Sequence, residues 1–80
     1  MATVGRVKLD EIRRMLKKCA PGFVWKEKPH HHWVTYNGRT YRALPKGEHG
    51  GKNAEIEQGH IKKMARFLEI LECAKQQLGI

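Results

Sequence analysis

The stretch HHWVTYNGRTYRAL, residues 31–44, decides the fold. At its centre, Asn37-Gly38 is the strongest short-range signal for a two-residue hairpin turn, because both residue types tolerate the left-handed backbone that such a turn requires. We therefore expect antiparallel strands over His31 to Tyr36 and Arg39 to Leu44. The segment Phe23 to Lys28, which is followed by a proline, predicts a third short strand.

A helix is predicted before these strands. Leu9, Ile12, Leu16 and Cys19 recur at the spacing of an amphipathic helix whose other face is strongly basic. Ala20-Pro21-Gly22 ends this helix, since proline cannot continue it and glycine accepts the left-handed turn.

A second helical period begins at Ile56 and predicts one stripe along the rest of the chain: Ile61, Met64, Ala65, Leu68, Leu71 and Leu78. The order is helix, three strands, helix (α-β-β-β-α). We expect an α+β fold, a three-stranded antiparallel sheet with both helices on one face. Eighty residues suffice for one small domain. We assign it to residues 7–80, after a flexible N-terminus at 1–6, with a mobile loop from Pro45 to Asn53.

The formal charge is +8, and all of the excess lies in the first two thirds of the chain. Up to Asn53 there are 12 basic and 4 acidic residues, and from Ala54 onward 4 of each. Such a charge attracts polyanions, most plausibly nucleic acid, although it is also typical of a solvated surface that keeps a small protein soluble. The expected phosphate contacts are Arg13, Arg14, Lys17, Lys18, Lys26 and Lys28.

The chain has no apolar run of the ~18 residues that a membrane span needs, and its first six residues lack the apolar stretch of a signal peptide. We therefore expect a cytoplasmic protein that binds no membrane. In that compartment, Cys19 and Cys73, both at apolar helical positions, are expected to be buried thiols rather than a disulfide. Neither has a second cysteine or a histidine at metal-motif spacing, so we predict no metal centre there.

Three consecutive histidines, His30-His31-His32, open the second predicted strand. Strand alternation places His30 and His32 on one face and His31 on the other with Trp33, which we expect in the core. Three interpretations stand: a metal site built on His30 and His32, a surface cluster, or acid–base catalysis. In the last case, histidine would move protons while an RNA 2′-hydroxyl attacks its adjacent phosphate, and Lys or Arg would stabilise the charged phosphorane.

Several motifs resemble those of one family. Gly22-Phe23-Val24 is a glycine-aromatic-aliphatic entry to the first strand, and His30 at a strand start is followed three positions on by Trp33. Asn37-Gly38 occupies the hairpin turn, and the next strand ends near Pro45. The most specific match is IEQGHI, residues 56–61, which is similar to the helix start I-x-x-G-x-(L/I). In these features the chain, from about Val7 to Ile70, resembles the HicA toxins, small bacterial mRNA interferases.

The resemblance implies a fold like the double-stranded-RNA-binding domain. It also implies a metal-independent endoribonuclease that cleaves mRNA without a cofactor and is silenced by a HicB-type antitoxin. His30 is the leading acid–base residue, and His31 and His32 are the fallbacks. Because Lys28-Pro29 precedes them where the family has a small pair, either His30 or His31 is the counterpart.

Two alternatives and one minor site stay open. The chain could be a non-catalytic RNA-binding module with the same fold, or an interaction protein for an acidic protein surface. Gly59 and His60, at the predicted helix start, are either exposed first-turn residues or donors of backbone amides to a phosphate.

Overall fold

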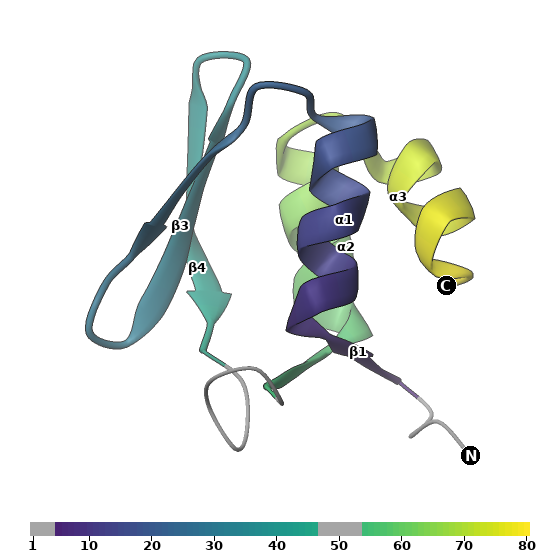
Figure 1. The fold of residues 1–80 in the computed structure, drawn as a ribbon, viewed down its shortest axis with the longest axis horizontal. Helices are drawn as coiled ribbons and strands as arrows, with labels where there is room; N and C mark the ends of the chain where they lie inside the picture. Colours follow the sequence, from purple (N-terminus) through teal and green to yellow (C-terminus); the bar gives the residue numbers. More distant parts are fainter. Residues whose placement is uncertain (1–4, 47–53) are drawn as a thin grey trace.

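The computed structural model describes residues 5–46 and 54–80, and it confirms an α+β fold with a three-stranded antiparallel sheet. The elements, in chain order (Figure 1), are β1 (Arg6–Lys8), α1 (Leu9–Cys19), β2 (Val24–Glu27), β3 (His31–Tyr36), β4 (Arg39–Pro45), β5 (Glu55–Glu57), α2 (Gln58–Phe67) and α3 (Leu71–Leu78). Most of the predicted loop from Pro45 to Asn53 lies outside the described residues.

The sheet has the order β2-β3-β4, and the predicted hairpin joins β3 to β4. Asn37 and Gly38 both have positive φ, 54° and 77°, as the two-residue turn requires. The turn sets the register, since Tyr36 pairs with Arg39 and Val34 with Tyr41. Further along, His32 pairs with Leu44, so β4 carries one extra residue, a bulge opposite Trp33.

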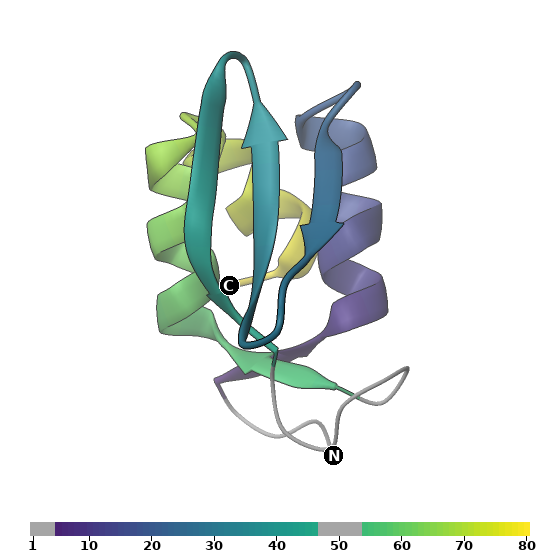
Figure 2. The same ribbon diagram turned by 90° about the vertical axis from the view of Figure 1, so that its left-hand side faces the viewer.

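The helices lie on one side of the sheet, as expected (Figures 1 and 2). α1 and α2 form the layer next to it, and α3 lies on the far side of that pair. The inward face of the sheet contributes Val34 and Leu44 to a fully buried core, where they join Leu16 of α1 and Ile61 and Met64 of α2. The core is therefore formed by apolar residues that recur at helical and strand spacing in the sequence, as their periodicity predicted.

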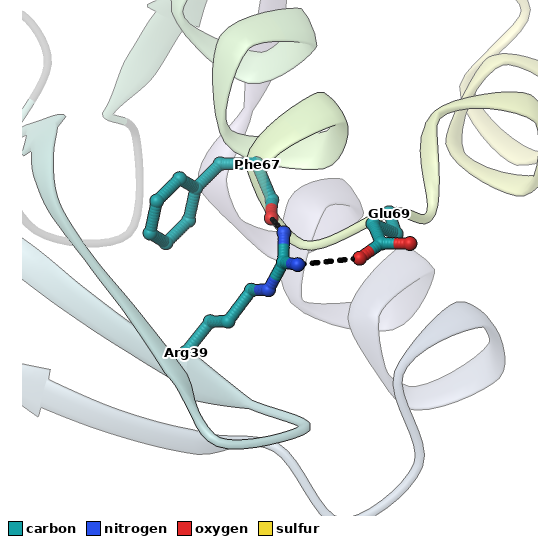
Figure 3. Close-up of polar contacts among 3 residues, drawn as sticks. All are labelled: Arg39, Phe67 and Glu69. Atoms are coloured by element: carbon teal, nitrogen blue, oxygen red, sulfur yellow. Dashed lines mark hydrogen bonds and ion pairs between the residues drawn. The ribbon is translucent and has the colours of Figure 1, made fainter.

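The C-terminal helix is two helices, so the prediction of one continuous stripe from Ile61 to Leu78 is wrong. The chain leaves α2 at Leu68 and passes through Glu69, whose φ of 62° is left-handed and cannot continue a helix. Arg39 stabilises this corner (Figure 3). Its Nη1 donates to the carbonyl oxygen of Phe67 at 2.9 Å, and its Nη2 lies 2.7 Å from the Glu69 carboxylate.

A second, two-stranded sheet was not predicted. β1 and β5 pair antiparallel, with Val7 opposite Ile56, and both side chains are buried. Arg6, assigned from sequence to the flexible N-terminus, therefore lies in a strand, and Ile56 precedes α2 rather than starting it. Strands of three residues are too short to show an alternating pattern.

The cysteines form a disulfide, Cys19–Cys73, so the expectation of two free thiols is wrong. The break after α2 explains the error. It turns α3 back against α1 and brings the two Cα atoms to 5.7 Å, within bridging distance. Among the described residues, no helix combines the length and apolar character needed to cross a bilayer.

Candidate nucleic-acid interface

The three consecutive histidines occupy three different environments. His30 is exposed in the three-residue connection between β2 and β3, where the Lys28 amide donates to the His31 carbonyl at 2.9 Å. His31 is the first residue of β3, and its side chain is exposed. His32 faces the helices and is only 3% exposed. The prediction that His30 and His32 share one face of a strand is therefore wrong, because His30 lies before the strand, which begins at His31 as predicted.

His32 packs inside the molecule against Trp25 of β2, with ring centroids 4.7 Å apart. The guanidinium of Arg13 covers the same indole, its Cζ 5.1 Å from the ring centre. Burial lowers the pKa of His32, as do the nearby charges of Lys46 and Arg13, while Glu27 opposes them. His32 is therefore neutral at neutral pH and out of reach of a polymeric substrate.

The opposite side of the sheet, which we call the outer face, is covered by none of the described helices (Figure 2). Alternation and register place eight side chains on it: Val24 and Lys26 of β2, Lys28 just beyond it, His31, Trp33 and Thr35 of β3, and Thr40 and Arg42 of β4. The two threonines share a hydrogen bond at 2.9 Å. None of these eight residues is acidic, so the outer face carries three positive charges with no negative one.

Trp33 lies at the centre of the outer face, so its predicted place in the core is wrong. Lys28 and Arg42 both approach its indole, with Nζ 4.6 Å and Cζ 5.1 Å from the ring centre. Lys26 is its direct cross-strand neighbour on β2. An aromatic ring set among cations is a surface suited to nucleic acid, because bases stack on the ring and phosphates pair with the charges.

The predicted phosphate contacts do not form one surface. Lys26 and Lys28 lie on the outer face, whereas Arg13 covers Trp25 on the inner side. Arg14 and Lys18 are exposed, but they line a groove between α1 and α3.

The remaining candidates lie elsewhere. Lys17 is exposed on α1. Gly59 and His60 are exposed in the first turn of α2, next to the β1–β5 sheet. His60 borders a pocket there with Lys46 and Glu57. Carboxylates share that pocket and the α1–α3 groove, so the outer face is the more uniformly cationic surface.

The sequence analysis missed Arg42 as a cation of the outer face, and it assigned Trp33, a half-buried aromatic of that face, to the core. The signal for both was available. A two-residue turn at Asn37-Gly38 pairs Tyr36 with Arg39, and counting back from it places Arg42 beside Trp33. The assignment of Trp33 to the core failed because the neighbouring His32, a polar residue, takes the buried position.

Among the described residues, no three His, Cys, Asp or Glu side chains are grouped so as to hold a metal ion. Comparisons of the chain with protein-family models, curated proteins and solved structures return no match.

Proposed function

We propose that this protein is a metal-independent endoribonuclease of the HicA toxin type, which cleaves mRNA on the outer face of its sheet. The observation that supports this most is the position of His31. It is an exposed histidine, fixed in a β-strand, on a surface that carries Lys26, Lys28 and Arg42 and no carboxylate. His30, its neighbour, is exposed in the adjacent turn.

The proposed reaction is an attack by the RNA on itself. One of His30 and His31 takes the proton from a 2′-hydroxyl, whose oxygen forms a bond to the adjacent phosphorus. The bond from phosphorus to the 5′-oxygen breaks, and the other histidine gives that oxygen a proton. The products are a 2′,3′-cyclic phosphate and a free 5′-hydroxyl. Lys28 and Arg42 stabilise the additional negative charge on the phosphorane.

His32 has a structural role in this proposal. Its imidazole is buried against Trp25, and its lowered pKa keeps it uncharged. It supports the strand from which His31 projects. The catalytic assignment thus narrows from three histidines to the two exposed ones.

A toxin of this type needs a protein that silences it, and the HicA resemblance implies a HicB-type antitoxin. An acidic partner would be complementary to the outer face, where it would block RNA and shield the histidines. The second candidate function is a non-catalytic RNA-binding module. The cation-flanked Trp33 on the outer face favours it equally, since binding requires no histidine.

The experiment is incubation of the purified protein with an unstructured, end-labelled RNA in excess EDTA. We expect cleavage with 2′,3′-cyclic phosphate ends, and none for the same sequence made with 2′-deoxynucleotides, which lack the attacking hydroxyl. Binding of both strands without cleavage of either would contradict the enzyme and support the binding module.

A further inference from the structure

The outer face carries a feature that proton transfer does not use, the half-buried indole of Trp33, which lies outside the core. The other tryptophan, Trp25, lies on the inner side of the sheet against His32. A tryptophan is among the largest apolar side chains, and Trp33 lies outside the core with part of its ring open to solvent.

Among the residues that the structure describes, Lys28 and Arg42 beside Trp33 have no carboxylate partner. Both nevertheless approach the same ring. Cation–π attraction holds each of them there, while the two positive charges repel each other. An anion placed beside the ring would relieve that repulsion.

We propose that Trp33, Lys28 and Arg42 form a binding site for one nucleotide of single-stranded RNA. The base stacks on the indole, and Lys28 and Arg42 move from the ring onto the phosphates on either side of that nucleotide. This inference deepens the proposed function and rests on it for the choice of RNA, but the site itself needs no catalysis.

The geometry favours an unpaired strand over a duplex. In a double helix the faces of the bases are stacked on one another, so an indole reaches a base face only where the base is unpaired. His31 is two residues from Trp33 on the same face of β3, roughly 7 Å along the strand at ~3.3 Å per residue. A nucleotide stacked on Trp33 therefore has its phosphate near the exposed histidines.

The test measures binding with RNA oligonucleotides that are 2′-O-methylated and cannot be cleaved through the 2′-oxygen. In Trp25→Phe, Trp33 is the only tryptophan, and we expect its fluorescence to be quenched by a single strand and not by a duplex of the same sequence. In the otherwise unchanged protein, Trp33→Leu should weaken binding about tenfold, within the range measured for a base–aromatic stack, and Trp33→Phe should restore most of it.

The matched control is the charge pair on the opposite side of the molecule. Lys28→Gln with Arg42→Gln should weaken single-strand binding, whereas Arg14→Gln with Lys18→Gln should have less effect. Unchanged affinity in Trp33→Leu, measured by anisotropy of a labelled strand, would overturn the site. Equal quenching by an acidic peptide that competes with the RNA would also overturn it and would assign the face to a protein partner. Quenching by RNA in a protein that never cleaves RNA would support this site and contradict only the enzyme.

Discussion

The imidazole of His32 packs against the indole of Trp25, with ring centroids 4.7 Å apart, on the side of the sheet that faces α1. The buried His32 thus differs from His30 and His31, whose side chains are exposed. A histidine triplet that looks uniform in sequence is thus a buried packing residue preceded by two residues that are open to a substrate.

The burial of His32 predicts that acid destabilises the protein. Its pKa is lowered in the folded state, so below about pH 6.5 the unfolded chain binds the proton more readily and unfolding becomes more favourable. From this group we expect the free energy of unfolding to be larger at pH 8 than at pH 5.5. Urea unfolding at both pH values measures it. His32→Phe, which keeps an aromatic ring and cannot titrate, should lose this part of the pH dependence; an unchanged dependence would contradict the assignment.

The disulfide should contribute much of the stability of α3. Only Ala74 of that helix is fully buried, and the bridge closes a loop over a sequence separation of 54. By loop entropy, its removal should cost about 4 kcal/mol, with 2–4 kcal/mol the typical range. Urea unfolding with and without reductant measures this cost. The double variant Cys19→Ser with Cys73→Ser should be as unstable as the reduced protein and insensitive to reductant. Coincident curves for the oxidised and reduced protein would contradict a structural bridge.

We expect Arg39 to stabilise the fold more through its hydrogen bond to the carbonyl of Phe67 than through its ion pair with the carboxylate of Glu69. Both contacts are exposed, but the hydrogen bond satisfies an oxygen at the end of α2 that the helix leaves unpaired, whereas the ion pair joins two side chains that water can solvate. We expect Arg39→Met to cost about 1 kcal/mol and Glu69→Gln less than about 0.5 kcal/mol in thermal or urea unfolding. Equal costs for the two variants would show that the ion pair is the stronger contact.

We expect RNA affinity to fall with salt concentration mainly because the cations of the outer face contact phosphates. Each phosphate contact to a single strand adds about 0.7 to the slope of log affinity against log salt concentration. Lys28→Gln with Arg42→Gln should therefore lower that slope by about 1.4 if each contacts one phosphate. Arg14→Gln with Lys18→Gln makes the same change in charge near α3, and we expect a smaller change in slope. A larger change in slope for the Arg14 and Lys18 pair would indicate that the RNA binds at α1, where the sequence analysis placed most of the phosphate contacts.

The sequence predicted the fold well wherever one local signal determined it. Asn37-Gly38 determined the hairpin and its register, and the spacing from Leu9 to Cys19 determined α1. The break between α2 and α3 depends on tertiary contacts, because Arg39 is 28 residues away from the Phe67 carbonyl that it binds. The same break creates the disulfide, so the error over the helix produced the error over the thiols.

The candidate site was half predicted. The cationic character of Lys26 and Lys28 followed from composition, and Arg42 follows from the register. Strand alternation correctly placed His31 with Trp33 on one face of β3 and His32 on the other. It did not show which of the two faces is buried, because that depends on the packing of His32 against Trp25.

The most direct test of the central claim is the cleavage rate of an unstructured RNA by single histidine variants, in EDTA, with circular dichroism as the folding control. We expect His30→Ala and His31→Ala each to lower the rate by about 10²- to 10⁴-fold, the usual range for general acid–base groups, with RNA affinity nearly unchanged. His32→Phe should cleave at close to the rate of the unmodified protein while it remains folded. Full activity in both His30→Ala and His31→Ala, or loss of activity in a folded His32→Phe alone, would contradict the account.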